Sequence, residues 1–360
     1  MADPRIERYA ALLVDRCVDV QPGWQVLVHS SPAARPLIEE VLRRIARRGA
    51  HALMRLSFGS GGPPETSWAE EAPEELLAEL APVERTTYET IDCLIVIQAP
   101  ENLREGASLT PERQALIRRS MQPFMPRLLG GEVKWVGCQF PTPALAQEAG
   151  MTLRQFEEFL YGSILLDWEQ MRQEMERIAT RFDAAETVRV VGDETDVSFS
   201  LAGRRGLVDA LGANMPGGEV FYSPVEDSAE GVVTFSEYPT QWGGRELAGV
   251  RLRFERGRAV EATARVNGEY LNQVLDTDEG ARTLGEFGIG CNPGIQRHMK
   301  NTLFDEKIEG TVHFALGAGF PFLGGSNESS VHWDMVKDLR PGGEIWCDGE
   351  LVQRDGRWLI

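Results

Sequence analysis

The first half of the chain alternates between two patterns of apolar and polar positions. Short apolar runs, each typical of a strand, occur at residues 26–28, 52–54, 91–97 and 133–138. Apolar residues at the three- and four-residue spacing of a helix occur over residues 5–18, 36–48, 74–80 and 111–120. Alternating strands and helices are typical of right-handed crossovers and a mostly parallel sheet. The first half therefore predicts an α/β domain.

The pattern changes near residue 185, where helical spacing becomes scarce. Short β-type runs follow at residues 188–191, 197–201, 250–254 and 260–266. Gly192, Gly203 and Gly257 lie between these runs as turn signals. A long helical pattern near residues 153–181 predicts a connecting helix. We therefore expect residues 1–184 to form an α/β domain that ends with this helix, and residues 185–360 to form a β-rich domain.

Composition and charge narrow the class of protein. The 360 residues are 42% hydrophobic and 26% charged, which is ordinary for a globular protein. A net charge of −18 disfavours nucleic acid and anionic membranes as partners. The apolar run at residues 93–97 is far shorter than the roughly 20 residues that span a bilayer. Because residues 1–5 also lack the pattern of a signal peptide, we expect a cytoplasmic protein.

Two histidines lie in segments that alternate as strands do. His313 faces the same way as Ala315 and Gly317, away from the large apolar residues of its segment. His332 and Asp334 share one face of a second segment and lie about 7 Å apart along it. Such a pair can bind one metal ion or two adjacent ions, or it can be hydrogen-bonded in a polar core. The local pattern leaves both interpretations open.

Two glutamates extend this set of candidates. Glu219 and Glu286 are single acids in glycine-rich, apolar segments, where a buried carboxylate is costly unless it is paired or binds a metal ion. Alternatively, each caps a loop or pairs with an arginine. With His313, His332 and Asp334 they make a plausible ligand set for two divalent ions, and these ligand types suit Zn, Co or Mn. A dinucleotide-binding loop at residues 288–294 is disfavoured because its spacing is wrong.

Several motifs together resemble the thermophilic aminopeptidases of the aminopeptidase T and aminopeptidase S type. The matching segments, in order, are residues 23–28, 214–221, 284–286, 301–306, 313–317 and 327–334. The resemblance implies an α/β N-terminal domain, a C-terminal domain that carries two metal ions, and a homodimer held largely by the C-terminal half. It also implies an exopeptidase that removes N-terminal residues from peptides. The implied metal ligands are Glu219, Glu286, His313, His332 and Asp334.

The chain departs from that family at three places. Phe320 stands where familiar members have a tyrosine, Gly218 stands where some relatives have an acid, and the two histidines are only 19 positions apart. Phenylalanine cannot donate a hydrogen bond to an oxyanion, and loss of such a donor can cost on the order of 10²–10³ in rate. Tyr222 and Tyr238 are the nearest hydroxyls by sequence that could replace it.

The expected mechanism is metal-assisted hydrolysis, with a carboxylate that accepts a proton from water. The sequence does not identify this base, and the weak candidates are Glu226 and Asp227, followed by Glu230 and Glu328. The expected substrate is a peptide. Two alternatives remain: a metal-dependent hydrolase of another amide or ester, and a non-catalytic metal-binding homologue.

Overall fold

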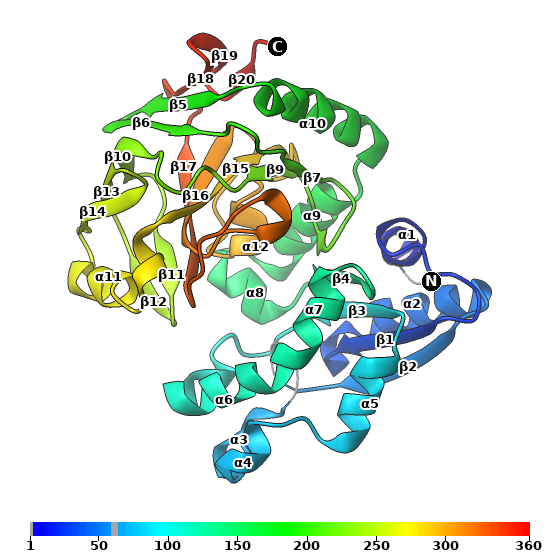
Figure 1. Cartoon of the computed structure of the whole chain (residues 1–360). Helices are drawn as coiled ribbons and strands as arrows, with labels where there is room; N and C mark the ends of the chain where they lie inside the picture. Colours follow the sequence, from blue (N-terminus) through cyan, green and yellow to red (C-terminus); the bar gives the residue numbers. More distant parts are fainter. Residues whose placement is uncertain (1–2, 59–63) are drawn as a thin grey trace. The chain divides into compact units, whose positions relative to one another are not determined.

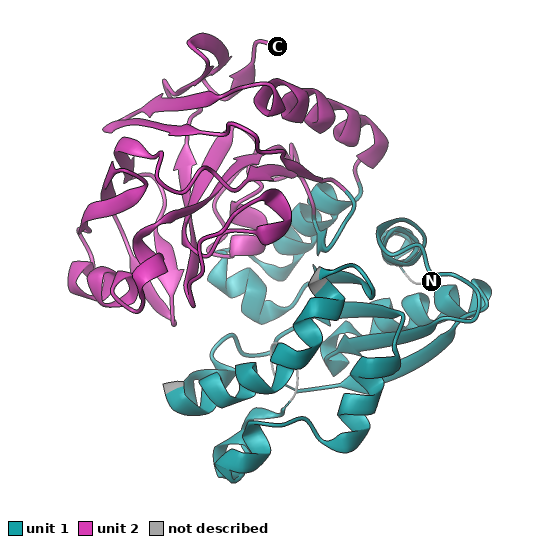
Figure 2. Cartoon of the chain, in the orientation of Figure 1, with its two compact units in different colours: residues 1–165, 211–216 teal, residues 166–210, 217–360 magenta. Residues whose placement is uncertain are grey.

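The computed structural model describes residues 3–58 and 64–360, which form two compact units. The first unit comprises Met1–Leu165 and Leu211–Pro216, and the second comprises Leu166–Ala210 and Gly217–Ile360 (Figure 2). Along the chain, the first unit therefore gives way to the second after Leu165. The sequence predicts a domain boundary after residue 184. Among the helices in the described part of the chain, none is long and apolar enough to cross a membrane.

The first unit contains a five-stranded parallel sheet in the order β2-β1-β3-β4-β8 (Figure 1). Its strands are β1 (Gln25–Ser30), β2 (His51–Leu56), β3 (Cys93–Gln98), β4 (Lys134–Gln139) and β8 (Asn214–Met215). The expected mostly parallel α/β sheet is thus confirmed. β8 comes from a distant part of the sequence and adds the last strand to this sheet.

The helices of the first unit lie mostly between its strands in the sequence. They are α1 (Pro4–Ala11), α2 (Arg35–Arg47), α3 (Thr66–Glu71), α4 (Glu74–Leu77), α5 (Pro82–Thr90), α6 (Pro111–Met121), α7 (Met125–Leu129), α8 (Pro143–Glu148) and α9 (Leu153–Ile164). α9 begins with a capping box, in which Thr152 and Gln155 satisfy each other's backbone N–H groups. The single helix expected near residues 153–181 is in fact two helices. The break occurs because Asp167 caps α10 (Trp168–Asp183) by accepting a hydrogen bond from Gln170 N.

The second unit is built from antiparallel sheets, as expected for a β-rich region. An eight-stranded sheet has the order β14-β13-β10-β6-β5-β18-β19-β20, a five-stranded sheet has the order β17-β16-β15-β9-β7, and β11 pairs with β12 (Figure 1). The strands are β5 (Thr187–Gly192), β6 (Thr195–Ser200), β7 (Leu207–Asp209), β9 (Glu219–Tyr222), β10 (Glu230–Phe235), β11 (Thr240–Trp242), β12 (Arg245–Leu247), β13 (Val250–Glu255), β14 (Arg258–Thr263), β15 (Leu284–Gly290), β16 (Thr311–Gly317), β17 (His332–Asp338), β18 (Glu344–Cys347), β19 (Glu350–Arg354) and β20 (Arg357–Trp358). Two short helices, α11 (Gly268–Leu275) and α12 (Thr302–Asp305), complete this unit with α10.

An aromatic core joins the two large sheets of the second unit. Phe199 of β6 lies 4.8 Å from Phe287 of β15, and Phe287 lies 5.6 Å from Phe314 of β16, measured between ring centroids. Side chains alternate between the two faces of a strand, so the residues next to these rings point to the opposite face of the five-stranded sheet. Glu286 and His313 are such neighbours. The core therefore fixes which face of the sheet carries the candidate ligands.

Candidate metal centre

Four adjacent strands of the five-stranded sheet carry all the expected ligands. Glu219 begins β9, Glu286 lies in β15 and His313 lies in β16, while His332 and Asp334 lie in β17. Strand pairing sets Gly288 opposite His313 and Ala315 opposite both Glu286 and Asp334. Antiparallel pairing therefore brings together side chains that are far apart in the sequence.

The ligand atoms form two groups that share Glu286. In the first group, His313 Nε2 lies 3.2 Å from Glu286 Oε1 and 3.6 Å from Glu219 Oε2. In the second, His332 Nε2 lies 3.0 Å from Glu286 Oε2 and 3.7 Å from Asp334 Oδ1. Within each group the candidate ligand atoms all lie within 4.8 Å of one another. Glu286 therefore offers one oxygen to each group.

Backbone carbonyls fix the orientation of both imidazoles. His313 Nδ1 lies 3.1 Å from Glu306 O, and His332 Nδ1 lies 2.9 Å from Ala318 O. Because a carbonyl oxygen can only accept, each Nδ1 must carry a hydrogen and donate it. Each Nε2 consequently points toward the carboxylates, which is the usual arrangement of a metal-binding histidine with its supporting acceptor.

Two buried carboxylate oxygens of the cluster lack a hydrogen-bond partner. Glu219 Oε2 and Asp334 Oδ1 are buried and accept no hydrogen bond. An unsatisfied buried oxygen is costly, and a bound cation would remove that cost. The set of two imidazole nitrogens and three carboxylates suits divalent Zn, Co or Mn. The residues present therefore fit the metal ions that the sequence predicts.

Burial and mutual contact displace the pKa values of the cluster. Burial raises the pKa of Glu219 well above its usual range and that of Asp334 to about 6. Burial acts in the same sense on Glu286, but hydrogen bonds from His313 and His332 outweigh it and lower the pKa of Glu286 to about 2. Burial disfavours the charged imidazoles, yet Glu286 raises the pKa of His313 to about 9 and of His332 to about 10. The cluster therefore attracts positive charge.

Glycines make room for this arrangement. A Cβ atom at Gly288 would overlap the imidazole of His313 on the neighbouring strand. Gly218, directly before Glu219, has φ +114°, and a Cβ atom there would lie 2.7 Å from Asn292 Cβ. The glycines around the two glutamates thus allow close contacts that a larger residue would prevent.

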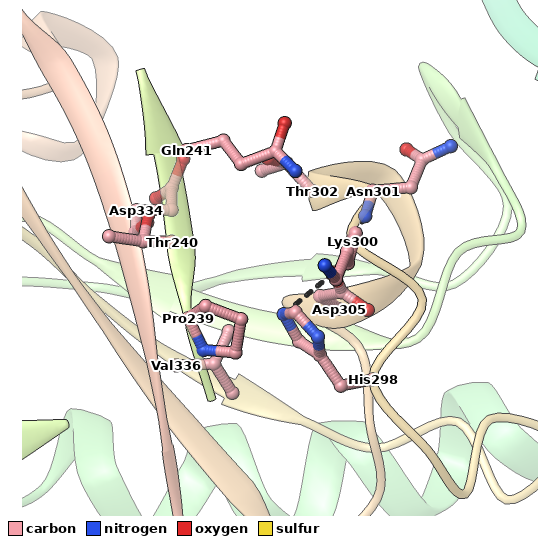
Figure 3. Close-up of a pocket in the computed structure, with 10 residues that line it drawn as sticks. All are labelled: Pro239, Thr240, Gln241, His298, Lys300, Asn301, Thr302, Asp305, Asp334 and Val336. Carbon is pink, nitrogen blue, oxygen red and sulfur yellow. Dashed lines mark hydrogen bonds and ion pairs between the residues drawn. The ribbon is translucent and has the colours of Figure 1, made fainter. Parts of the chain in front are cut away.

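A small polar cavity lies beside Asp334 (Figure 3). It has a volume of about 40 Å³, enough for on the order of two water molecules. Its lining residues are Pro239, Thr240, Gln241, His298, Lys300, Asn301, Thr302, Asp305, Asp334 and Val336. His298 Nε2 pairs with Asp305 Oδ2 at 3.1 Å on its wall. The cavity therefore gives Asp334 a polar neighbourhood on the side of α12.

The structure does not bring the suggested bases into either ligand group. Glu226 Oε2 accepts from Arg204 Nη2 at 2.8 Å, and its Oε1 accepts from Ser326 N at 2.6 Å. Asp227 is exposed in the turn that follows. Glu230 Oε1 accepts from Arg256 N at 2.8 Å, and Glu328 is exposed. The assignment of the base therefore gains no support from these contacts.

Both suggested hydroxyls are engaged elsewhere. Tyr222 stands opposite Phe287 in the sheet register, on the aromatic face, and donates to Asp183 Oδ1 at 3.0 Å. Tyr238 donates to Asp338 Oδ2 at 2.8 Å. Phe320, by contrast, lies beside the cluster, with its ring centroid 5.1 Å from that of His332. The position of the missing family tyrosine is therefore adjacent to a candidate ligand.

Two neighbours of the cluster were not singled out from the sequence. Lys307 is fully buried and its Nζ lies 3.3 Å from Glu219 Oε1, and it also pairs with Glu306. Glu306 lies beside the first ligand group, because its backbone carbonyl accepts from His313 Nδ1 at 3.1 Å. In the sequence Lys307 stands among the acidic residues Asp305, Glu306 and Glu309, and this pattern does not reveal that Glu219 is its partner.

Comparisons with known proteins agree with the geometry. The family described as "Thermophilic metalloprotease (M29)" matches residues 2–358. Aminopeptidase 2 of Geobacillus stearothermophilus is 26% identical, over 99% of this chain and 98% of that protein. The solved structure of wild-type AmpT from Thermus thermophilus has a TM-score of 0.84 at 23% identity, over 99% of each chain. 2,5-Dihydroxypyridine dioxygenase from Pseudomonas putida KT2440 has a TM-score of 0.60 at 14% identity, over 99% of this chain and 96% of that one.

These findings differ in what they establish. The two structural matches, both under 25% identical, show the fold, which a dioxygenase also has. The family match spans nearly the whole sequence and confirms the resemblance to aminopeptidases T and S. The chain therefore belongs to the M29 family of thermophilic metalloproteases.

Proposed function

We propose that this metalloaminopeptidase uses two divalent metal ions to remove N-terminal residues from peptides. Glu219, Glu286 and His313 would hold one ion, and Glu286, His332 and Asp334 would hold the other. The observation that carries the proposal is the position of Glu286, whose two oxygens face the Nε2 atoms of two different histidines. Divalent ions in such a site lower the pKa of bound water and polarise a carbonyl group.

Residues outside the ligand set would orient the metal ligands and shape the site. The carbonyls of Glu306 and Ala318 hold the two imidazoles with Nε2 toward the cluster. Ser223 Oγ accepts from Phe320 N at 2.9 Å and so fixes the loop beside His332. Because Phe320 has no hydroxyl, this position provides no hydrogen bond to an oxyanion.

An aromatic patch beside the cluster supports a preference for apolar N-terminal residues. Phe320 lies 5.3 Å from both Phe221 and Phe322, measured between ring centroids, and also contacts His332. Phe322 is 55% exposed, so its ring is accessible to a ligand. Rings of this kind bind apolar side chains through burial of surface from water. We therefore expect leucyl and phenylalanyl peptides to be cleaved faster than glutamyl or lysyl peptides.

The homodimer remains a proposal based on the family resemblance, and the cytoplasmic location remains a proposal based on the sequence pattern. Light scattering at micromolar concentration would measure a particle of twice the 40.0 kDa chain mass if the dimer forms. A particle of the mass of one chain would contradict it.

A peptide panel tests the proposed activity most simply. Metal-free protein would be loaded separately with Zn, Co or Mn and incubated with free and N-acetylated leucyl peptides. We expect metal-dependent release of leucine from the free peptides and none from the acetylated ones, because an aminopeptidase requires the free amine. Protein that holds two ions but cleaves no peptide would favour a hydrolase of another amide or ester. Inertness toward esters and other amides as well would favour a non-catalytic homologue.

A further inference from the structure

Lys307 places a buried positive charge next to a cluster suited to cations. Its side chain has 0% exposure, and its Nζ lies 3.3 Å from Glu219 Oε1. The same ammonium pairs with Glu306, and Asp209 stands opposite Glu219 in the sheet register. A charge of the same sign as a metal ion would be expected to weaken its binding. Attraction of the metal ion therefore cannot explain why Lys307 lies here.

The two oxygens of Glu219 have different surroundings. Oε1 faces Lys307, whereas Oε2 is buried without a hydrogen-bond partner and lies 3.6 Å from His313 Nε2. A carboxylate is planar, so a contact that holds Oε1 also sets the direction of Oε2. The result is a single free oxygen directed toward the first ligand group.

The backbone holds Lys307 in a defined place relative to Glu219. Lys307 N donates to Phe304 O at 3.0 Å, and Lys307 O accepts from Asn292 N at 2.9 Å. Asn292 Nδ2 in turn donates to Gly217 O at 2.9 Å, two residues before Glu219. The lysine and the glutamate are therefore tied to the same loop, and their contact does not depend on a freely moving side chain.

We propose that Lys307 is a positioning residue for the metal site formed by Glu219, Glu286 and His313. It holds Oε1 of Glu219 so that Oε2 alone is presented as a ligand. The inference rests on the proposed two-metal function. The second ligand group has separate support, since Ala318 O orients His332, so the effect belongs to the first site.

The variant Lys307→Met tests this role, with Lys337→Met as its matched control. Lys337 is also a lysine with 0% exposure, but its Nζ pairs with Glu237 Oε1 at 2.7 Å and donates to Asp193 O at 3.0 Å. Zn²⁺ alone would be titrated into each metal-free protein in competition with a chelator. Loss of a supporting contact typically weakens metal binding about 10–100-fold. We expect that loss at one of two sites in Lys307→Met and at neither site in Lys337→Met.

The outcomes separate this inference from the proposed function. Wild-type protein that binds fewer than two ions contradicts the two-metal proposal itself. If the wild type binds two ions, three results overturn the role of Lys307: unchanged affinities in Lys307→Met, equal weakening of both sites, or tighter binding at the first site, which would mean that charge repulsion dominates.

The Zn-loaded wild-type crystal structure gives a second test that does not depend on a variant that folds. We expect Lys307 Nζ within hydrogen-bond distance of Glu219 Oε1 and only Oε2 bound to zinc. Both oxygens on zinc, or Lys307 displaced from Glu219, would contradict the inference.

Discussion

At the scale of single residues, the absence of a side chain at Gly288 is as important as the ligands themselves. A Cβ atom there would overlap the ring of His313, which lies opposite in the sheet register. We predict that Gly288→Ala displaces this ring and weakens the first metal site at least tenfold, since a ligand held out of place binds poorly. Chelator competition would measure the loss. Gly162→Ala is the control because a Cβ atom there has nothing within 4 Å. Unchanged affinity in Gly288→Ala would contradict the account.

Phe320 offers a prediction in the opposite direction. Its ring lies beside His332, so Phe320→Tyr would add a hydroxyl near the second ligand group. If the family role of this position applies, the metal-loaded variant should gain peptidase rate, by up to about 10²-fold. Initial rates on a leucyl peptide would measure the gain. The control, Tyr222→Phe, removes a hydroxyl bound to Asp183 and should cost about 1 kcal/mol of stability without slowing the reaction. A sharp loss of rate in that control would assign the role to Tyr222.

The raised pKa values of the two histidines predict how metal binding depends on pH. His313 and His332 have pKa values of about 9 and 10 in the metal-free protein. Each imidazole is therefore protonated on both nitrogens, and positively charged, at pH 7. A metal ion needs the unprotonated Nε2, so binding releases these protons, and the apparent affinity rises with pH until the higher of the two pKa values, about 10, is passed. The expected slope is up to tenfold per pH unit for each proton released. Calorimetry in buffers of different ionisation enthalpy would count the protons, and an affinity independent of pH between 6 and 8 would refute the charge state.

At the scale of elements, α10 depends on its own cap. Asp167 accepts from Gln170 N and starts a helix that buries Phe182 against the aromatic core. Asp167→Ala should lower the free energy of unfolding by about 0.5–2 kcal/mol, as loss of such a cap usually does. Denaturant titration would measure this change. Metal content should stay the same because the ligands lie on β9, β15, β16 and β17. A loss of bound metal would link the helix to the site in a way that this account does not include.

The elements also show which features are predictable from sequence. Alternation within a strand is local, so the faces of His313, His332 and Asp334 follow from their own segments. The sharing of Glu286 depends on which strands pair and in what register, which is set by long-range packing. The same holds for Lys307, which follows α12 and whose partner Glu219 lies on β9. β8 could not be anticipated either, because its two residues, Asn214–Met215, join a sheet whose other strands end far earlier in the sequence.

At the scale of the whole molecule, the alternation of strands and helices correctly predicts one α/β sheet and one β-rich region. The candidate metal centre lies entirely within the second compact unit. The family match, in contrast, spans residues 2–358 and so includes both units. We therefore propose that the metal chemistry takes place in the second unit.

The central claim is that Glu286 serves two metal ions at once, and its removal tests that claim most directly. Zinc content per chain would be measured by elemental analysis after dialysis, for the wild type and for Glu286→Gln. The account predicts two ions in the wild type and weakened binding of both in the variant, because the neutral amide of glutamine offers a single oxygen to two groups and removes the negative charge that both groups share. A wild type with a single ion, or a variant that loses one ion and retains the other at unchanged affinity, would contradict it.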